Sequence, residues 1–127
     1  MELVVIVVVV ALLEYIYISL QVGQGRGKYE VPAPAISGHP TFERLYRVQM
    51  NTLEQLIVFL PAIGLFATYV SAGIAAALGV VFIVGRFLYL RGYVEDPEKR
   101  TVGFLLGFVA NAILLLGALI GAAIKLL

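Results

Sequence analysis

Four long apolar segments, separated by more polar residues, follow one another along the chain. They cover about residues 3–22, 45–70, 73–93 and 102–126. Each reaches the roughly 20 residues that a helix needs to cross the hydrocarbon core of a bilayer. Lipid offers the backbone no hydrogen-bond partner, and the alternating pattern of a transmembrane β-barrel is missing. The pattern predicts an all-α membrane protein, a four-transmembrane-helix bundle forming one domain over residues 1–127.

Glycines, prolines and capping residues mark the breaks between these segments. Residues 23–41 hold four glycines and three prolines, which predicts a break in the helix and the only long loop. Residues 70–73 predict a short turn, so the second and third helices should be antiparallel neighbours. Asp96 and Pro97 are typical of a helix start and place Arg100 in the opening turns of the fourth helix. The first segment lacks a basic leader and a small-residue cleavage site, so we expect no cleaved signal.

Composition agrees with a membrane protein. The 127 residues are 61% hydrophobic and 13% charged, and the mean hydropathy is +1.00. A net charge of +1 is too small to indicate nucleic-acid binding. The absence of cysteine excludes disulfides and thiolate metal sites, and the one histidine, His39, lies in the long loop. We therefore expect no metal cofactor.

The basic residues predict the orientation in the membrane. Eight of the nine lie in or beside the first and third loops, and only Lys125 lies at the other end. The positive-inside rule places those loops in the cytoplasm and both termini on the non-cytoplasmic side.

The second helix carries a polar stripe. Arg47, Asn51 and Glu54 are spaced i, i+4 and i+7, so they point within about 60° of one another. A cation, an amide and an anion together can hold a zwitterionic ligand, such as a peptide with free carboxylates and an amine. The alternative interpretation is a buried polar network that fixes helix packing.

The third and fourth helices add polar residues near the same interface. Arg86, Tyr89 and Tyr93 share a face of the third helix, and Arg100 opens the fourth. The tyrosines could instead belong to an interfacial aromatic belt. The fourth helix also has two GxxxG spacings, typical of close packing within a bundle or between subunits. Three arginines could simply reach lipid phosphates: Arg44, Arg86 and Arg91.

A resemblance to a known family is carried by residues 42–54 (FERLYRVQMNTLE), residues 85–93 (GRFLYLRGY) and Arg100. These motifs resemble the MAPEG family, the membrane-associated proteins in eicosanoid and glutathione metabolism. The similarity spans nearly the whole chain and is greatest to bacterial members and to the branch with microsomal glutathione transferases and the leukotriene-forming synthase. It implies a homotrimer in a bacterial inner membrane, with glutathione bound between subunits near the cytoplasmic side.

The resemblance also implies roles for single residues. Arg100 matches the arginine that favours the thiolate of glutathione. A free thiol with a pKa of ~8.5 is mostly protonated at neutral pH, and a nearby guanidinium lowers that pKa. Gln55 departs from the family tyrosine, Gly27 replaces a second basic residue, and the approach to Arg100 is acidic. The residues implied to hold glutathione are Arg26, Arg47, Gln49, Asn51, Glu54, Tyr89 and Tyr93.

The resulting hypothesis is a glutathione transferase that conjugates lipophilic electrophiles from the bilayer, or reduces lipid hydroperoxides as a peroxidase. One alternative is a non-catalytic lipid-binding scaffold of the same family. Another is a small proton-coupled multidrug transporter that uses Glu14, although the arginines would repel cationic drugs. Within the family interpretation, Glu14 could face a trimer axis or pair with Gln21 or Asn111.

Overall fold

The chain folds into four long helices. A computed structural model describes residues 1–127, the side chain of residue 97 excepted. The elements are α1 (Glu2–Lys28), α2 (Pro40–Tyr69), α3 (Ala72–Glu95), the short 3-10 helix η1 (Pro97–Arg100) and α4 (Thr101–Leu126). The four long helical segments are each long and apolar enough to cross a membrane. The prediction of an all-α membrane protein with four transmembrane helices is confirmed.

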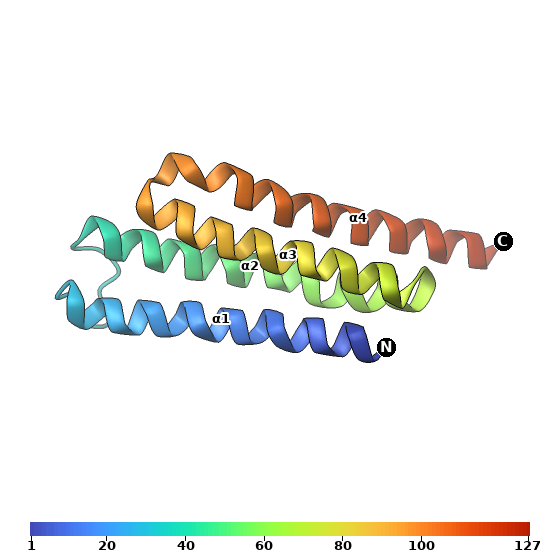
Figure 1. Cartoon of the computed structure of the whole chain (residues 1–127), viewed down its shortest axis with the longest axis horizontal. Helices are drawn as coiled ribbons and strands as arrows, with labels where there is room; N and C mark the ends of the chain where they lie inside the picture. Colours follow the sequence, from blue (N-terminus) through green and yellow to red (C-terminus); the bar gives the residue numbers. More distant parts are fainter.

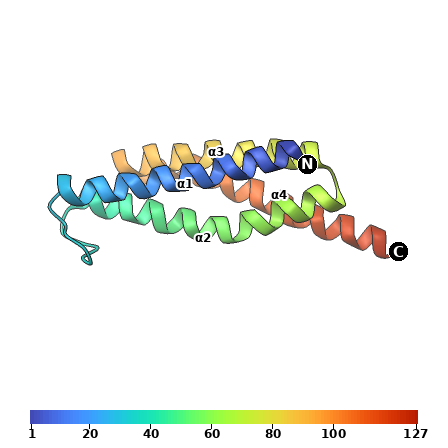
Figure 2. The ribbon, with the colours of Figure 1, turned by 90° about the horizontal axis from the view of Figure 1, so that it is seen from below.

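The helices form an antiparallel bundle in which α2 and α3 are central. Both pack against each other and against α1 and α4, which lie on opposite sides (Figure 1). The α1–α2 loop and the α3–α4 connection lie at one end of the bundle, and both termini lie at the other (Figures 1 and 2). The segments that carry Arg47, Tyr93 and Arg100 therefore lie toward the loop end.

Two hydrophobic clusters fill the bundle. The cluster toward the termini includes Phe59 and Phe82, whose stacked rings lie 4.0 Å apart between centroids. The cluster at the loop end includes Phe42 and Tyr89. On α3, Arg86 lies between Phe82 and Tyr89, so a buried charge separates the two clusters.

The predicted end of the first helix was wrong, because α1 continues through its glycines to Lys28. Each glycine costs a helix about 1 kcal/mol relative to alanine, but Gly25 is buried against α2. A Cβ at Gly25 would lie only 3.1 Å from Leu45 Cδ1, so the glycine permits this close approach. Tertiary packing therefore overrides the local propensity.

The second helix begins earlier than predicted, at Pro40. The His39 Nδ1 accepts a hydrogen bond of 3.1 Å from the Thr41 N–H, and proline occupies the first turn, where no N–H is needed. The long loop therefore shortens to residues 29–39. The tight turn before α3 and the Asp96 cap are confirmed: Ser71 Oγ accepts from the Ile74 N–H, and Asp96 Oδ1 accepts from the Glu98 N–H.

Both GxxxG spacings of α4 pack within the chain. A Cβ on Gly85 of α3 would lie 2.9 Å from Gly103 O and from Gly107 N, so α3 and α4 touch through their backbones. Farther along, Gly117 lies against the Phe66 ring and Gly121 against the end of α2. The first of these contacts fixes where α4 presents Arg100 to α3.

Candidate functional site

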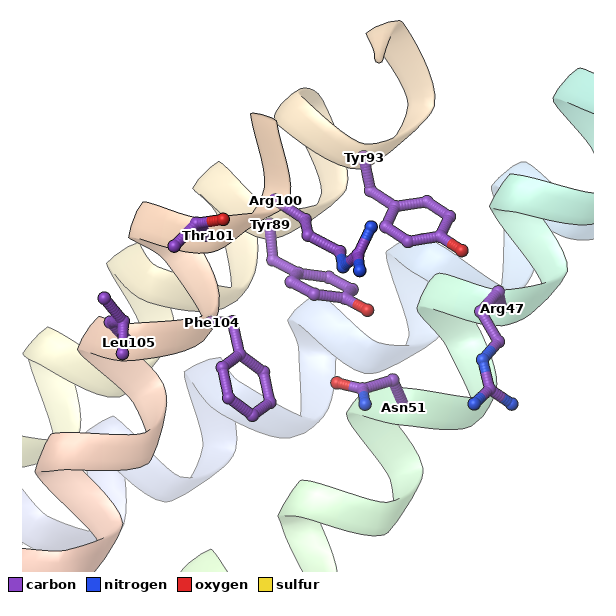
Figure 3. Close-up of a pocket in the computed structure, with 8 residues that line it drawn as sticks. All are labelled: Arg47, Asn51, Tyr89, Tyr93, Arg100, Thr101, Phe104 and Leu105. Carbon is purple, nitrogen blue, oxygen red and sulfur yellow. The ribbon is translucent and has the colours of Figure 1, made fainter. Parts of the chain in front are cut away.

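A cavity of about 540 Å³ opens between α2, α3 and α4 at the loop end of the bundle. This volume lies in the range of small-molecule sites, which is about 300–1,000 Å³. Figure 3 shows its lining side chains, which come from α2, α3, η1 and the start of α4: Arg47, Asn51, Tyr89, Tyr93, Arg100, Thr101, Phe104 and Leu105.

Helix α2 contributes a cation and an amide. Arg47 and Asn51 lie one turn apart, Arg47 exposed and Asn51 half-buried. The Asn51 Oδ1 accepts a hydrogen bond of 2.8 Å from Arg86 Nη2. Because the amide oxygen is engaged with the protein, the Asn51 Nδ2 is left to donate toward a ligand in the cavity.

Helix α3 contributes two phenols. The rings of Tyr89 and Tyr93 stack with their centroids 5.5 Å apart, and Tyr89 is only 4% exposed. Both hydroxyls point toward α2 (Figure 3). The tyrosines thus present hydrogen-bonding groups toward the side of the cavity that carries Arg47 and Asn51.

Helix η1 and the start of α4 complete the cavity. The Arg100 guanidinium carbon lies 5.5 Å from the Tyr93 ring centroid, within cation–π range. Thr101, Phe104 and Leu105 were not predicted from sequence, although Phe104 follows Arg100 at i+4 and Leu105 follows Thr101 at i+4. They give the cavity one largely apolar wall opposite its polar side.

The acidic residues before Arg100 have other contacts. The Glu95 carboxylate forms an ion pair of 2.7 Å with Lys99 Nζ. Asp96 caps the backbone of η1. Of these two carboxylates, the charge of Glu95 is paired with Lys99, and Asp96 serves as a helix cap.

Three of the eight predicted site residues do not line the cavity. Arg26 Nη1 donates to Val31 O at 3.2 Å and to Ala35 O at 2.7 Å, so it holds the α1–α2 loop. Gln49 Nε2 donates to Ser19 Oγ on α1 at 3.1 Å. Glu54 is exposed on α2. The structure therefore gathers Arg47, Asn51, Tyr89, Tyr93 and Arg100, but not Arg26, Gln49 or Glu54.

The suggestion that Arg86 reaches lipid phosphates is wrong. Arg86 is 0% exposed, donates to Asn51 and lies with its guanidinium carbon 4.3 Å from the Tyr89 ring centroid. Glu14 on α1 is half-buried. The described side chains show no hydrogen bond from Glu14 to Gln21 or Asn111, and Asn111 Nδ2 donates to Gln55 instead.

The described side chains offer no metal-binding group. Within the part that the structure describes, no group of three or more His, Cys, Asp or Glu side chains could hold a metal ion. His39 stacks on Tyr29 with ring centroids 4.4 Å apart and caps α2, which is a structural use.

The fold and the cavity define an integral, multi-pass membrane protein whose polar residues meet in an arginine- and tyrosine-lined site at one end of a four-helix bundle. The chain belongs to the MAPEG family, whose model matches residues 4–120. The resemblance predicted from the second- and third-helix motifs is thereby confirmed. This membership replaces the alternative of a multidrug transporter, which was suggested by Glu14 in a short four-helix chain.

Several relatives are similar over part of the chain. An uncharacterized protein of Synechocystis sp. is 53% identical over 92 residues, covering 72% of this chain and 67% of the relative. Human microsomal glutathione S-transferase 2 is 42% identical over 92 residues, covering 72% and 63%. Bovine leukotriene C4 synthase is 34% identical over 72 residues, covering 57% and 48%. The matches thus span about half to two thirds of these relatives.

Proposed function

We propose that the protein binds glutathione in the cavity and joins the glutathione sulfur to lipophilic electrophiles that arrive from the bilayer. The observation that carries this proposal is the convergence of Arg47, Asn51, Tyr89, Tyr93 and Arg100 on one cavity. Relatives named as a glutathione S-transferase and as leukotriene C4 synthase support the choice of ligand.

The lining chemistry suits a tripeptide with two carboxylates. A guanidinium pairs with a carboxylate through two parallel N–H donors, and the cavity offers Arg47 and Arg100 on different helices. The Asn51 Nδ2 and the tyrosine hydroxyls add neutral hydrogen bonds. We assign Arg47 to a glutathione carboxylate and Arg100 to the sulfur, because Arg100 lies beside the apolar wall where an acceptor would meet it.

The proposed reaction is a nucleophilic substitution. Arg100 favours the thiolate over the thiol, and the proton leaves to water at the mouth of the cavity. The thiolate attacks the electrophilic carbon of the acceptor, a carbon–sulfur bond forms, and the leaving group departs with its bonding electrons. Phe104 and Leu105 give the acceptor an apolar surface, so holding both reactants close supplies much of the acceleration.

The three predicted residues outside the cavity, Arg26, Gln49 and Glu54, would need a second subunit to contact glutathione. Within one chain they contact other parts of the protein or solvent. This agrees with the homotrimer that the resemblance implies. The grouping of basic residues at the same end supports a cytoplasmic entrance for glutathione, with both termini on the non-cytoplasmic side of a bacterial inner membrane.

Titration of the purified protein in detergent with glutathione, followed by conjugation of an aryl halide, tests the proposal. Arg47→Ala should weaken binding about tenfold, and Arg100→Ala should lower kcat more than it weakens binding. Arg91→Ala, an exposed arginine outside the cavity, is the matched control. Absence of glutathione binding refutes the proposal, and binding without turnover indicates the scaffold.

A parallel assay with a lipid hydroperoxide separates transfer from reduction. In reduction, two glutathione molecules become one disulfide while the hydroperoxide yields an alcohol and water. A conjugate requires only one glutathione molecule per acceptor. The ratio of glutathione consumed to product formed therefore assigns the activity.

A further inference from the structure

Arg86 lies behind the cavity and does not line it. Its side chain is 0% exposed in the middle of α3, within a span of the membrane. Burying a guanidinium at such a depth costs free energy, which its contacts must offset. Leucine or methionine would fill the same space at lower cost, which points to a requirement for the charge and its donors.

The hydrogen bond and the cation–π contact of Arg86 both go to residues of the cavity wall. Its Nη2 donates to the Asn51 Oδ1 at 2.8 Å, and its guanidinium carbon lies 4.3 Å from the Tyr89 ring centroid. Asn51 belongs to α2 and Tyr89 to α3, so one guanidinium supports two walls at once.

The hydrogen bond determines which end of the Asn51 amide faces the ligand. An asparagine can present its oxygen or its NH₂ group, and an arginine can only donate. Because Arg86 occupies the oxygen, the NH₂ group is the end that remains for the cavity. The site thereby offers a donor, which suits a carboxylate or thiolate.

Glu14 is the acidic residue on α1 that lies within electrostatic range of Arg86, and α1 packs against α3. Among the described residues the two side chains form no ion pair within 4.0 Å. Among the described side chains, Glu14 Oε1 has no hydrogen-bond partner, and neither have Arg86 Nε and Nη1. An unpaired acceptor and two unpaired donors on neighbouring helices are chemically complementary.

We propose that Arg86 is a positioning residue of the glutathione site, which fixes the Asn51 amide and the Tyr89 ring while Glu14 balances its charge inside the bundle. This inference rests on the proposed function for its ligand. Arg86 touches neither glutathione nor the reacting atoms, so its effect must pass through Asn51 and Tyr89.

A double-mutant cycle on glutathione affinity tests the link to Asn51. Arg86→Met and Asn51→Ala should each raise the Kd for glutathione about tenfold, measured by calorimetry in detergent. If Arg86 acts through Asn51, the double variant should be within about twofold of Asn51→Ala alone. If the double variant instead raises the Kd about a hundredfold, which is the product of the two single effects, the link to Asn51 is refuted.

Calorimetry also separates positioning from a merely structural role. A structural defect lowers the fraction of protein that binds and leaves the Kd of the remainder unchanged. Arg86→Lys provides a variant that keeps the charge in case Arg86→Met does not fold. Since an ammonium lacks the planar fork, we expect this variant to melt near the wild type but to bind glutathione several-fold more weakly. Wild-type affinity in Arg86→Lys contradicts positioning.

A second cycle, on melting temperature, tests the role of Glu14. Arg86→Met leaves the Glu14 carboxylate without its counter-charge, and Glu14→Gln leaves Arg86 without one, so each should lower the melting temperature. The double variant should melt at or above the less stable single variant. Glu2→Gln, an exposed carboxylate on the same helix, is the control. If the losses in melting temperature of the two single variants add up in the double variant, the pairing of Glu14 with Arg86 is refuted.

A failure of the proposed function and a failure of the positioning role of Arg86 give different results. If wild-type protein does not bind glutathione, the proposed function fails and the positioning of that ligand fails with it, while the melting cycle still decides the pairing of Glu14 with Arg86. If wild-type protein binds but the affinity cycle shows no coupling, only the inference fails.

Discussion

Substitution of Gly103 by alanine should disconnect α4 from α3 and impair the cavity. A Cβ at this position would overlap the Tyr89 backbone and lie 2.6 Å from Gly85 O. These atoms are backbone, so no side chain can turn aside. To reach an ordinary contact of 3.4 Å from Gly85 O, the helices must separate by about 0.8 Å.

A shift of this size has two measurable consequences. Overpacking in a helix contact costs about 1–3 kcal/mol of stability, which should appear as a lower melting temperature in detergent. The same shift carries Arg100 and Thr101 away from Tyr89 and Tyr93. Because a displacement of about 1 Å can lower a rate about a hundredfold, we expect conjugation to fall by one to two orders of magnitude.

Gly107 is the matched control, one turn farther along the same helix. A Cβ there would meet only side chains, Arg86 Cδ at 3.7 Å and Phe82 Cδ2 at 3.8 Å, which are ordinary contacts. Gly107→Ala should therefore keep wild-type turnover and melt at or slightly above the wild type, because alanine favours a helix over glycine. The reasoning is refuted if Gly103→Ala and Gly107→Ala behave alike in both assays.

Three further changes have defined outcomes. Gly27→Ala should raise the melting temperature by the equivalent of about 0.5–1 kcal/mol, because position 27 is helical and nothing lies within 4 Å of its Cβ; no change or a fall contradicts this. Arg26→Ala should make the α1–α2 loop more susceptible to protease, because two hydrogen bonds to that loop are lost; unchanged cleavage rules out the holding role. Arg100→Ala should move the midpoint of the pH–rate profile for conjugation upward, since the thiol loses a stabilising cation; an unmoved midpoint means Arg100 acts otherwise.

The helices could be predicted because lipid imposes a minimum length on an apolar segment, but their ends could not. The residues around Gly25 look like a loop by local propensity. They are helical because Leu45 and Phe42, which lie farther along the chain, pack closely against Gly25, where a larger side chain would be crowded. A sequence pattern carries no information about such a contact.

The same limit applies to the site. Helical spacing correctly joined Arg47 with Asn51 and Tyr89 with Tyr93, because each pair faces one direction. Spacing does not give depth, and Glu54 lies about 10 Å along the helix from Arg47. Phe104 and Leu105 could not be predicted as cavity residues, because an apolar residue in a membrane helix can equally line a cavity or face lipid.

The burial of Arg86 shows most clearly why depth matters. The sequence of α3 is apolar nearly all round, so it does not show which face meets α2 and which meets lipid. The structure places a polar layer beneath the cavity, consisting of Arg86 with Asn51 and the pair Gln55 and Asn111, with the apolar cluster of Phe59 and Phe82 deeper in the bundle. A charged tripeptide cannot enter that cluster without losing its hydrogen bonds. The layer therefore sets the depth at which glutathione would stop, and so fixes the level in the membrane at which its sulfur would meet a lipophilic acceptor.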